Sequence, residues 1–146
     1  MPEYLFKAKR TDNGEWVEGS LILVTGICAK ILYNVDEWAE IVFYTTNDKG
    51  FVTTHRYAVD PETICQYTGR NDRKGTKIFN SDRFRFFDEE GTSDYIVKWD
   101  DYECCYLIED ERGCTDSFNG FIAAYCEVLG NVHDSPKDAR KGGETE

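Results

Sequence analysis

The chain has 146 residues, of which 40% are hydrophobic and 14% aromatic, and a formal net charge of −11. This length fits one domain with a buried core, and the aromatic content argues against disorder over most of the chain. The acidic balance disfavours sequence-independent binding to nucleic acid, because such binding depends mainly on neutralising phosphates. No apolar run reaches the roughly 18–20 residues that span a bilayer, and the first ten residues lack the order of a signal peptide. We therefore expect a cytoplasmic protein that makes no membrane contact.

Two β-hairpins are expected in the first sixty residues. Residues 4–10 and 15–24 flank "TDNG" at 11–14, where Asn13 and Gly14 tolerate the positive φ of a tight turn. Residues 39–46 and 51–59 flank "NDKG" by the same logic. Between the hairpins the apolar stretch 29–35, "AKILYNV", predicts a strand, although the longer "GICAKILYNVDEWA" also fits a short helix.

Shorter strands are expected beyond Pro61, which biases the chain around it toward a turn. They cover 64–68, 82–88, 94–100, 103–110 and 127–134, with turns at 69–75, 89–93 and 111–116. A short helix is expected within 117–128, with Ser117 as its N-cap. The fold class is therefore mainly β: a hairpin-rich single domain over 1–136, a sandwich or small barrel with at most one or two short helices. The polar end, 137–146, is predicted to be a disordered tail.

Motifs of catalytic and metal sites are absent from the sequence. The two histidines, His55 and His133, have no nucleophile signature near them, so we predict that the protein is not an enzyme. The six cysteines lack the paired spacing of a zinc site, and the acidic turns lack the frame of a calcium loop. We expect no metal and no cofactor. Without an export signal, the cysteines are expected to be buried and reduced.

One basic segment stands out in this acidic chain. Residues 66–87 hold six Lys and Arg against two Asp, a net charge of +4, whereas residues 88–116 carry −9. The basic side chains are the weak candidate binding residues: Arg70, Arg73, Lys74, Lys77, Arg83 and Arg85. Together with Tyr67, Phe79, Phe84 and Phe86 they could bind a nucleic-acid strand through charge and stacking. The favoured interpretation is structural: Phe84 and Phe86 face the core, the arginines face water, and the loop complements the acidic hairpins that follow.

Four blocks of the sequence resemble the YopX-like family of phage and prophage proteins. They are "YLFKAKRTDNGEWVEGSLI", "VDPETICQYTGRNDRKGTKIFNSDRFRF", "YIVKWDD" and "EVLGNVHDSP". The resemblance implies a mainly β fold with an SH3-like small barrel element and no catalytic residues. It also implies that Gly69, Asp72, Gly75 and Asp82 determine turns and strand entry. The family tends to have Glu-Gly where this chain has Asn80-Ser81, and a smaller aliphatic residue where it has Phe84.

The resemblance and the composition together predict a class of function. The protein is expected to be a phage- or prophage-encoded accessory protein in the cytoplasm of a bacterial host, a non-enzymatic interaction module that contacts a protein partner or assembles with itself. One alternative is a nucleic-acid-associated protein that uses the basic segment 70–85. Another is an acidic DNA mimic that inhibits a host factor through residues 88–116.

Overall fold

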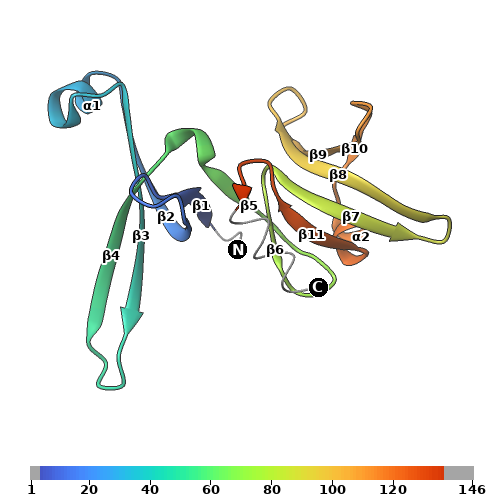
Figure 1. Cartoon of the computed structure of the whole chain (residues 1–146), viewed down its shortest axis with the longest axis horizontal. Helices are drawn as coiled ribbons and strands as arrows, with labels where there is room; N and C mark the ends of the chain where they lie inside the picture. The colour runs from blue at the N-terminus through green and yellow to red at the C-terminus, as the bar shows by residue number, and fades with distance from the viewer. Residues whose placement is uncertain (1–3, 137–146) are drawn as a thin grey trace. The chain divides into compact units, whose positions relative to one another are not determined.

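The computed structural model describes residues 4–136, and within them the chain is mainly β (Figure 1). It divides into two compact units, 1–66 and 67–146. Each unit has its own hydrophobic cluster, whereas the sequence predicts a single domain over 1–136. The predicted disordered tail, 137–146, lies outside the described residues.

Among the described residues, the first unit contains one α-helix, one short 3-10 helix and four complete strands. In chain order they are β1 (Phe6–Lys9), β2 (Trp16–Thr25), α1 (Gly26–Tyr33), β3 (Glu37–Thr46) and β4 (Val52–Val59), followed by a 3-10 helix at Pro61–Thr63. Neighbouring strands are antiparallel in the order β4-β3-β2-β1. The strand β5 (Cys65–Asn71) begins beside β1 and continues into the second unit.

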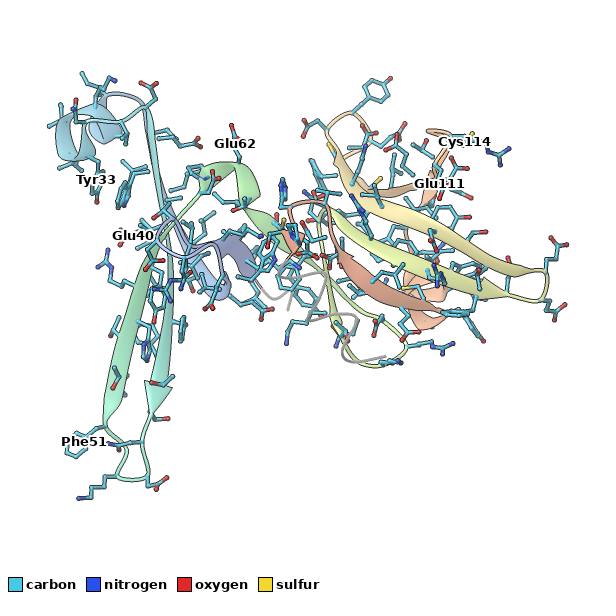
Figure 2. All side chains as sticks on the ribbon, viewed as in Figure 1. Tyr33, Glu40, Phe51, Glu62, Glu111 and Cys114 are labelled. Carbon is cyan, nitrogen blue, oxygen red and sulfur yellow. The ribbon has the colours of Figure 1, made fainter. Side chains whose placement is uncertain are left out.

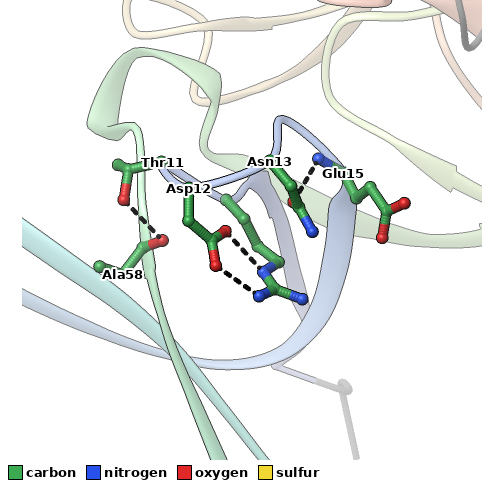
Figure 3. A network of polar contacts seen from close by, with 6 residues as sticks. Thr11, Asp12, Asn13, Glu15 and Ala58 are labelled. Atoms are coloured by element: carbon green, nitrogen blue, oxygen red, sulfur yellow. Dashed lines mark hydrogen bonds and ion pairs between the residues drawn. The ribbon is translucent and has the colours of Figure 1, made fainter.

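Local turn chemistry explains both predicted hairpins, which the structure confirms. Gly14 has a φ of +72°, and Arg10 binds Asp12 through two hydrogen bonds of 2.9 and 2.6 Å (Figure 3). The Arg10 guanidinium lowers the pKa of the Asp12 carboxyl. At the second turn, the Asn47 side chain accepts the backbone N–H of Phe51 at 3.0 Å. These contacts join residues that are only two to four positions apart, and they fix how the two strands of each hairpin pair.

The core of the first unit is small and aliphatic. Its buried members are Ala8, Ala39, Ile41 and Val59. Gly19 lies so close to β3 that a Cβ there would stand 2.4 Å from the carbonyl oxygen of Val42. Only glycine lets the two strands approach this closely.

The predicted strand at residues 29–35 is wrong. Most of these residues belong to a helix, the alternative that the longer segment also fits. α1 covers Gly26–Tyr33 and ends where Asn34 adopts a left-handed conformation with a φ of +57°. The Asn34 N–H donates to the carbonyl of Lys30 at 3.0 Å, which closes the last turn. Asn34 is one of the few residues that adopt this conformation readily, so it ends the helix and turns the chain toward β3.

The second unit contains a five-stranded antiparallel sheet and a short helix. Its elements are β6 (Lys77–Phe79), β7 (Asp82–Asp88), β8 (Gly91–Asp100), β9 (Cys105–Glu109), β10 (Thr115–Ser117), α2 (Gly120–Ala124) and β11 (Cys126–Asn131). The sheet order is β10-β9-β8-β7-β11, and β6 pairs with the end of β5. The described strands form open sheets and no closed barrel, so the SH3-like element stays a prediction.

One face of this sheet is covered by the second core. Phe84, Val97 and Ile108 are fully or almost fully buried there, beside Ala123 of α2 and Cys126 of β11. Phe86 packs against the same cluster. The prediction that Phe84 and Phe86 face the core is therefore confirmed.

The predicted helix within 117–128 exists but is shorter and starts later. Its cap is Asn119, whose side chain accepts the backbone N–H of Ile122 at 3.0 Å. Ser117, the predicted cap, is the last residue of β10. The helix therefore has room for only five residues before β11 begins.

Two buried aspartates hold the turns of the second unit. Asp82 is fully buried and accepts the backbone N–H of Phe79 and the amide of Asn131, each at 2.8 Å. Asp72 is 6% exposed and accepts the backbone N–H groups of Lys74 and Thr76, each at 2.9 Å. Both aspartates therefore hold the backbone of their turns, as the resemblance implies.

Candidate interaction surfaces

The six predicted binding residues lie on three different elements of the chain. Arg70 is on β5, Lys77 on β6, Arg83 and Arg85 on β7, and Arg73 and Lys74 in the turn between β5 and β6. The contacts of these residues decide whether they form one cationic site.

Arg73 and Lys74 are neutralised inside the molecule. Lys74 forms an ion pair with Glu127 of β11, and the Arg73 guanidinium lies 3.8 Å from the same carboxylate. Arg73 also lies over the ring of Phe87, 4.3 Å from its centroid. These two cations therefore bind the chain's own acidic and aromatic groups.

Arg85 is likewise paired within the unit. Its guanidinium donates two hydrogen bonds to Asp94 on the neighbouring strand, at 2.8 and 3.1 Å. Arg85 lowers the pKa of the Asp94 carboxyl, because the hydrogen bonds favour its charged form. Asp94 belongs to the acidic region 88–116, but Arg85 lies on β7 and not in the basic loop. The loop cations Arg73 and Lys74 pair with Glu127, outside that region, so the predicted pairing of the loop with the acidic hairpins is wrong for these two cations.

Arg70, Lys77 and Arg83 remain, and three of the four aromatic rings that the sequence interleaves with the basic segment are buried. Tyr67 is 8% exposed and Phe79 2%, and these two rings pack on each other. Phe84 is fully buried, so none of these three rings can stack on a base. Three of the four rings of the predicted stacking platform are therefore unavailable, and the fourth, Phe86, is partly buried against the core.

The turn at Asp72 and Arg73 covers the outer edge of β11. The Asp72 carboxylate accepts the backbone N–H of Val128 at 2.8 Å, and the Arg73 N–H donates to the carbonyl of Cys126 at 3.0 Å. Both groups point away from β7, the neighbour of β11. The turn takes the place of another strand, and this is the structural role of the centre of the basic segment.

A broad depression of about 630 Å³ lies on the second unit. Its charged lining residues are Arg83, Arg85, Asp94, Glu109, Asp110, Glu111 and Asp134. Arg85 pairs with Asp94, Lys98 pairs with Glu109, and Asp110 accepts two backbone N–H groups of its own turn. Neither histidine lines it. Asp94, Glu109 and Asp110 are thus engaged in contacts within the unit.

The thiols differ from the sequence prediction. Only Cys65 and Cys126 are buried, whereas Cys28, Cys104, Cys105 and Cys114 are exposed, and all six are free. Cys28 lies on α1, Cys104 and Cys114 flank β9, and Cys105 is the first residue of β9. Burial raises the pKa of the Cys126 thiol to about 12. Between residues 4 and 136 no three His, Cys, Asp or Glu side chains gather closely enough to hold a metal ion.

The helix α1 carries an aliphatic surface that sequence reasoning missed. Ile27 and Ile31 are each 74% exposed and Leu32 is 66% exposed, and Ala29 is the buried residue of this helix. We call Ile27, Ile31 and Leu32 the α1 surface. Tyr33, labelled in Figure 2, stacks on Trp38 with ring centroids 4.4 Å apart. The spacing of Ile27 and Ile31, one helical turn apart, was the sequence signal for this surface.

No helix within residues 4–136 has the length and apolarity that crossing a membrane requires. α1 in particular has eight residues, which is far below the roughly 20 needed to span a bilayer. Its exposed aliphatic residues therefore do not belong to a membrane-spanning helix.

Comparison with known proteins places the chain in a family. A family model described as YopX protein matches residues 5–138. Among solved structures, protein EF1440 from Enterococcus faecalis is similar, with a TM-score of 0.57 and 17% identity over 95% of this chain and 99% of that chain, which shows a shared fold. No curated protein matches. Because the family match extends over nearly the whole chain, this chain belongs to the YopX protein family.

Proposed function

We propose that this chain is a non-enzymatic interaction module that binds a protein partner through the α1 surface. The observation that carries the proposal is the exposure of Ile27, Ile31 and Leu32 on one short helix. Leaving three aliphatic side chains in water costs free energy, about 1.5–3 kcal/mol for each that a partner could fully bury. Adjacent exposed aliphatic residues are typical of protein–protein contact sites.

The family resemblance supports a setting for this function. We propose a phage- or prophage-encoded accessory protein that acts in the cytoplasm of a bacterial host. Its partner presents an apolar patch to α1, and the aliphatic contact needs no cofactor and no metal. The internal pairing of the depression's carboxylates supports a role in binding over one in catalysis.

The two alternatives predict other partners. A nucleic-acid-associated protein would use the basic segment 70–85, in which Arg73, Lys74 and Arg85 already pair with carboxylates of the chain. The buried rings of Tyr67, Phe79 and Phe84 count against this alternative. An acidic DNA mimic would present residues 88–116 to a basic host protein through salt-sensitive contacts.

The test is affinity capture of tagged full-length chain from host lysate, at low and high salt and with or without nuclease. The Ile31→Glu variant places a charge in the α1 surface, and Tyr102→Glu is its matched control because Tyr102 is 90% exposed on the second unit. We expect one protein partner that resists salt and nuclease, is retained by Tyr102→Glu and is lost with Ile31→Glu.

Other outcomes would overturn the proposal in recognisable ways. Material that nuclease removes would support the nucleic-acid alternative. A basic protein released by high salt, and retained by Ile31→Glu, would support the acidic mimic.

A further inference from the structure

One sheet edge of the first unit has no strand beside it. β4 pairs with β3 from Val52 to Val59, and on its other side it makes a single bridge, between Val59 and Arg10. Next to that bridge, the backbone N–H of Thr11 donates to the carbonyl of Ala58 at 3.0 Å, and the Thr11 hydroxyl reaches the same oxygen (Figure 3). Among the described residues nothing else pairs with this edge, so it is open from Val52 to Tyr57.

The other outermost strands of the two sheets within residues 4–136 are short or covered. β6 and β10 have three residues each, and the turn at Asp72 and Arg73 covers β11. Proteins usually protect a long edge with proline, lysine, a bulge or a cover, because bare N–H and C=O groups recruit other strands. The open stretch of β4, "VTTHRY", has no proline, lysine, bulge or cover, carries one charged side chain, Arg56, and is rich in residues that favour strands.

The hairpin contacts define which backbone groups face outward. Asn47 donates its N–H to the carbonyl of Phe51 at 3.0 Å. This bond shows which residues of β3 and β4 exchange backbone hydrogen bonds, since such residues alternate along each strand. Because antiparallel pairs alternate, the N–H and C=O of Val52, Thr54 and Arg56 point away from β3. The carbonyl of Ala58, which accepts the N–H of Thr11, also points away from β3 and continues this alternation. The open edge thus offers the N–H and C=O groups of three alternate residues to another strand.

The end of this hairpin lacks support from a third strand. β2 pairs with β3 only up to Val42, so Phe43–Thr46 and the β4 residues opposite them form a two-stranded ribbon (Figure 1). Tyr44, Phe51 and Val52 on this ribbon are 67, 68 and 63% exposed, and Figure 2 labels Phe51 beside the turn. A two-stranded ribbon is marginally stable in water, so another strand beside it would stabilise it.

We propose that β4 pairs antiparallel with β4 of a second copy of this chain, about a twofold axis at Thr54. The outward N–H of each Thr54 then donates to the outward C=O of Thr54 in the other copy. Val52 stands opposite Arg56 of the second copy, and Phe51 opposite its Tyr57. The pairing uses the whole open edge and joins two sheets into one.

The charge of Arg56 and the position of the turn disfavour the registers with an axis at Arg56 or at Val52. A twofold axis at Arg56 would place two guanidinium groups directly opposite each other, which is destabilising. An axis at Val52 would run into the turn after two residues. With the axis at Thr54, the two Arg56 positions are four residues apart along the strand, roughly 13 Å, which is beyond the Debye length of about 8 Å at physiological salt.

The first test is the mass of the full chain in solution, measured by sedimentation over micromolar to millimolar concentrations. We expect a dimer that weakens roughly tenfold or more with Thr54→Pro, because each copy loses the central N–H. The ladder to β3 does not use that N–H, so proline is tolerated at this edge position. Thr54→Val is the matched control, since it keeps the N–H and the shape of the side chain, and it should dimerise like the parent chain.

A second test does not depend on the folding of a proline variant. In the Thr54→Cys variant, a disulfide should join position 54 of one copy to position 54 of the other. Residues that form a hydrogen-bonded antiparallel pair have Cα atoms about 5.5 Å apart, which a disulfide can span. The variant is made with the four exposed cysteines replaced by serine, and Tyr44→Cys in the same background should not cross-link. A chain that is monomeric throughout, or a dimer that survives Thr54→Pro and forms no link at 54, would overturn the proposal. Ile31→Glu should leave the dimer intact. The proposal for β4 and the proposal for the α1 surface can therefore be refuted independently of each other.

Discussion

The carboxylate of Asp72 accepts the backbone N–H of Val128 at 2.8 Å, across 56 residues of sequence. With the N–H groups of Lys74 and Thr76, it satisfies three backbone donors. We predict that Asp72→Ala lowers the free energy of unfolding by about 2–4 kcal/mol, because these partly buried donors lose a charged acceptor. Urea unfolding followed by circular dichroism measures the loss. Asp88→Ala is the control: Asp88 caps one exposed N–H, and its loss should cost less than about 1 kcal/mol. Equal losses would contradict the assignment of Asp72 as an anchor.

Ser81 adopts a φ of +72°, at the position where the family tends to have glycine. A side chain in this left-handed region costs roughly 1 kcal/mol, and glycine avoids that cost. Ser81→Gly should therefore raise the free energy of unfolding by about 0.5–1 kcal/mol. Ser93→Gly, in the exposed part of β8, should lower it by a similar amount, because glycine weakens a strand. Thermal unfolding of the two variants beside the parent chain compares these effects, and destabilisation by Ser81→Gly would refute the prediction.

Thiol reactivity should divide the cysteines into two groups. At mildly alkaline pH, alkylation of the native protein should modify Cys28, Cys104, Cys105 and Cys114 rapidly, because these thiols are exposed. Cys65 and Cys126 should react only in denaturant, since they are fully buried and the pKa of Cys126 is raised to about 12. Peptide mass spectrometry after short labelling identifies the modified sites. Rapid native labelling of Cys126 would contradict its place in the core.

The ion pair between Arg85 and Asp94 should be visible in a pH titration. Because Arg85 lowers the pKa of Asp94, the stability from this pair is present above the ordinary aspartate pKa of about 4 and is lost as the pH falls through the lowered value. Arg85→Gln should return the pKa of Asp94 toward its ordinary value. Arg83→Gln, two residues away on the same strand, should not. Carbon NMR of the Asp94 carboxyl measures both shifts, and equal shifts would show a general charge effect in place of a specific pair.

Sequence reasoning succeeded where the chemistry is local. The turns at Asn13-Gly14 and Asn47–Gly50 define both hairpins within four residues, and the alternation around Phe84 predicts which residues enter the core. It failed at α1, because the contrast between a buried apolar face and a polar face, which usually reveals a helix, is missing there. Ile27 and Ile31 are apolar although they are exposed, so the sequence shows no polar face in this segment and its apolar run favoured a strand.

The candidate surfaces depend on contacts that no short window of sequence contains. The pairing of Lys74 with Glu127 spans 53 positions and requires the register of β11. The open edge of β4 follows from which strands do not reach it, and the composition of β4 does not encode that. The sequence therefore predicts the pieces of both units better than it predicts their free surfaces.

The distance in sequence between Asp72 and Val128 has a consequence for synthesis of the protein. The ribosome makes the turn that covers β11 56 residues before it makes Val128, the residue whose N–H that turn accepts. When β11 emerges, its outer hydrogen-bonding groups meet a ready acceptor and donor on their own chain. The strand is therefore shielded from neighbouring nascent chains from the moment it pairs with β7.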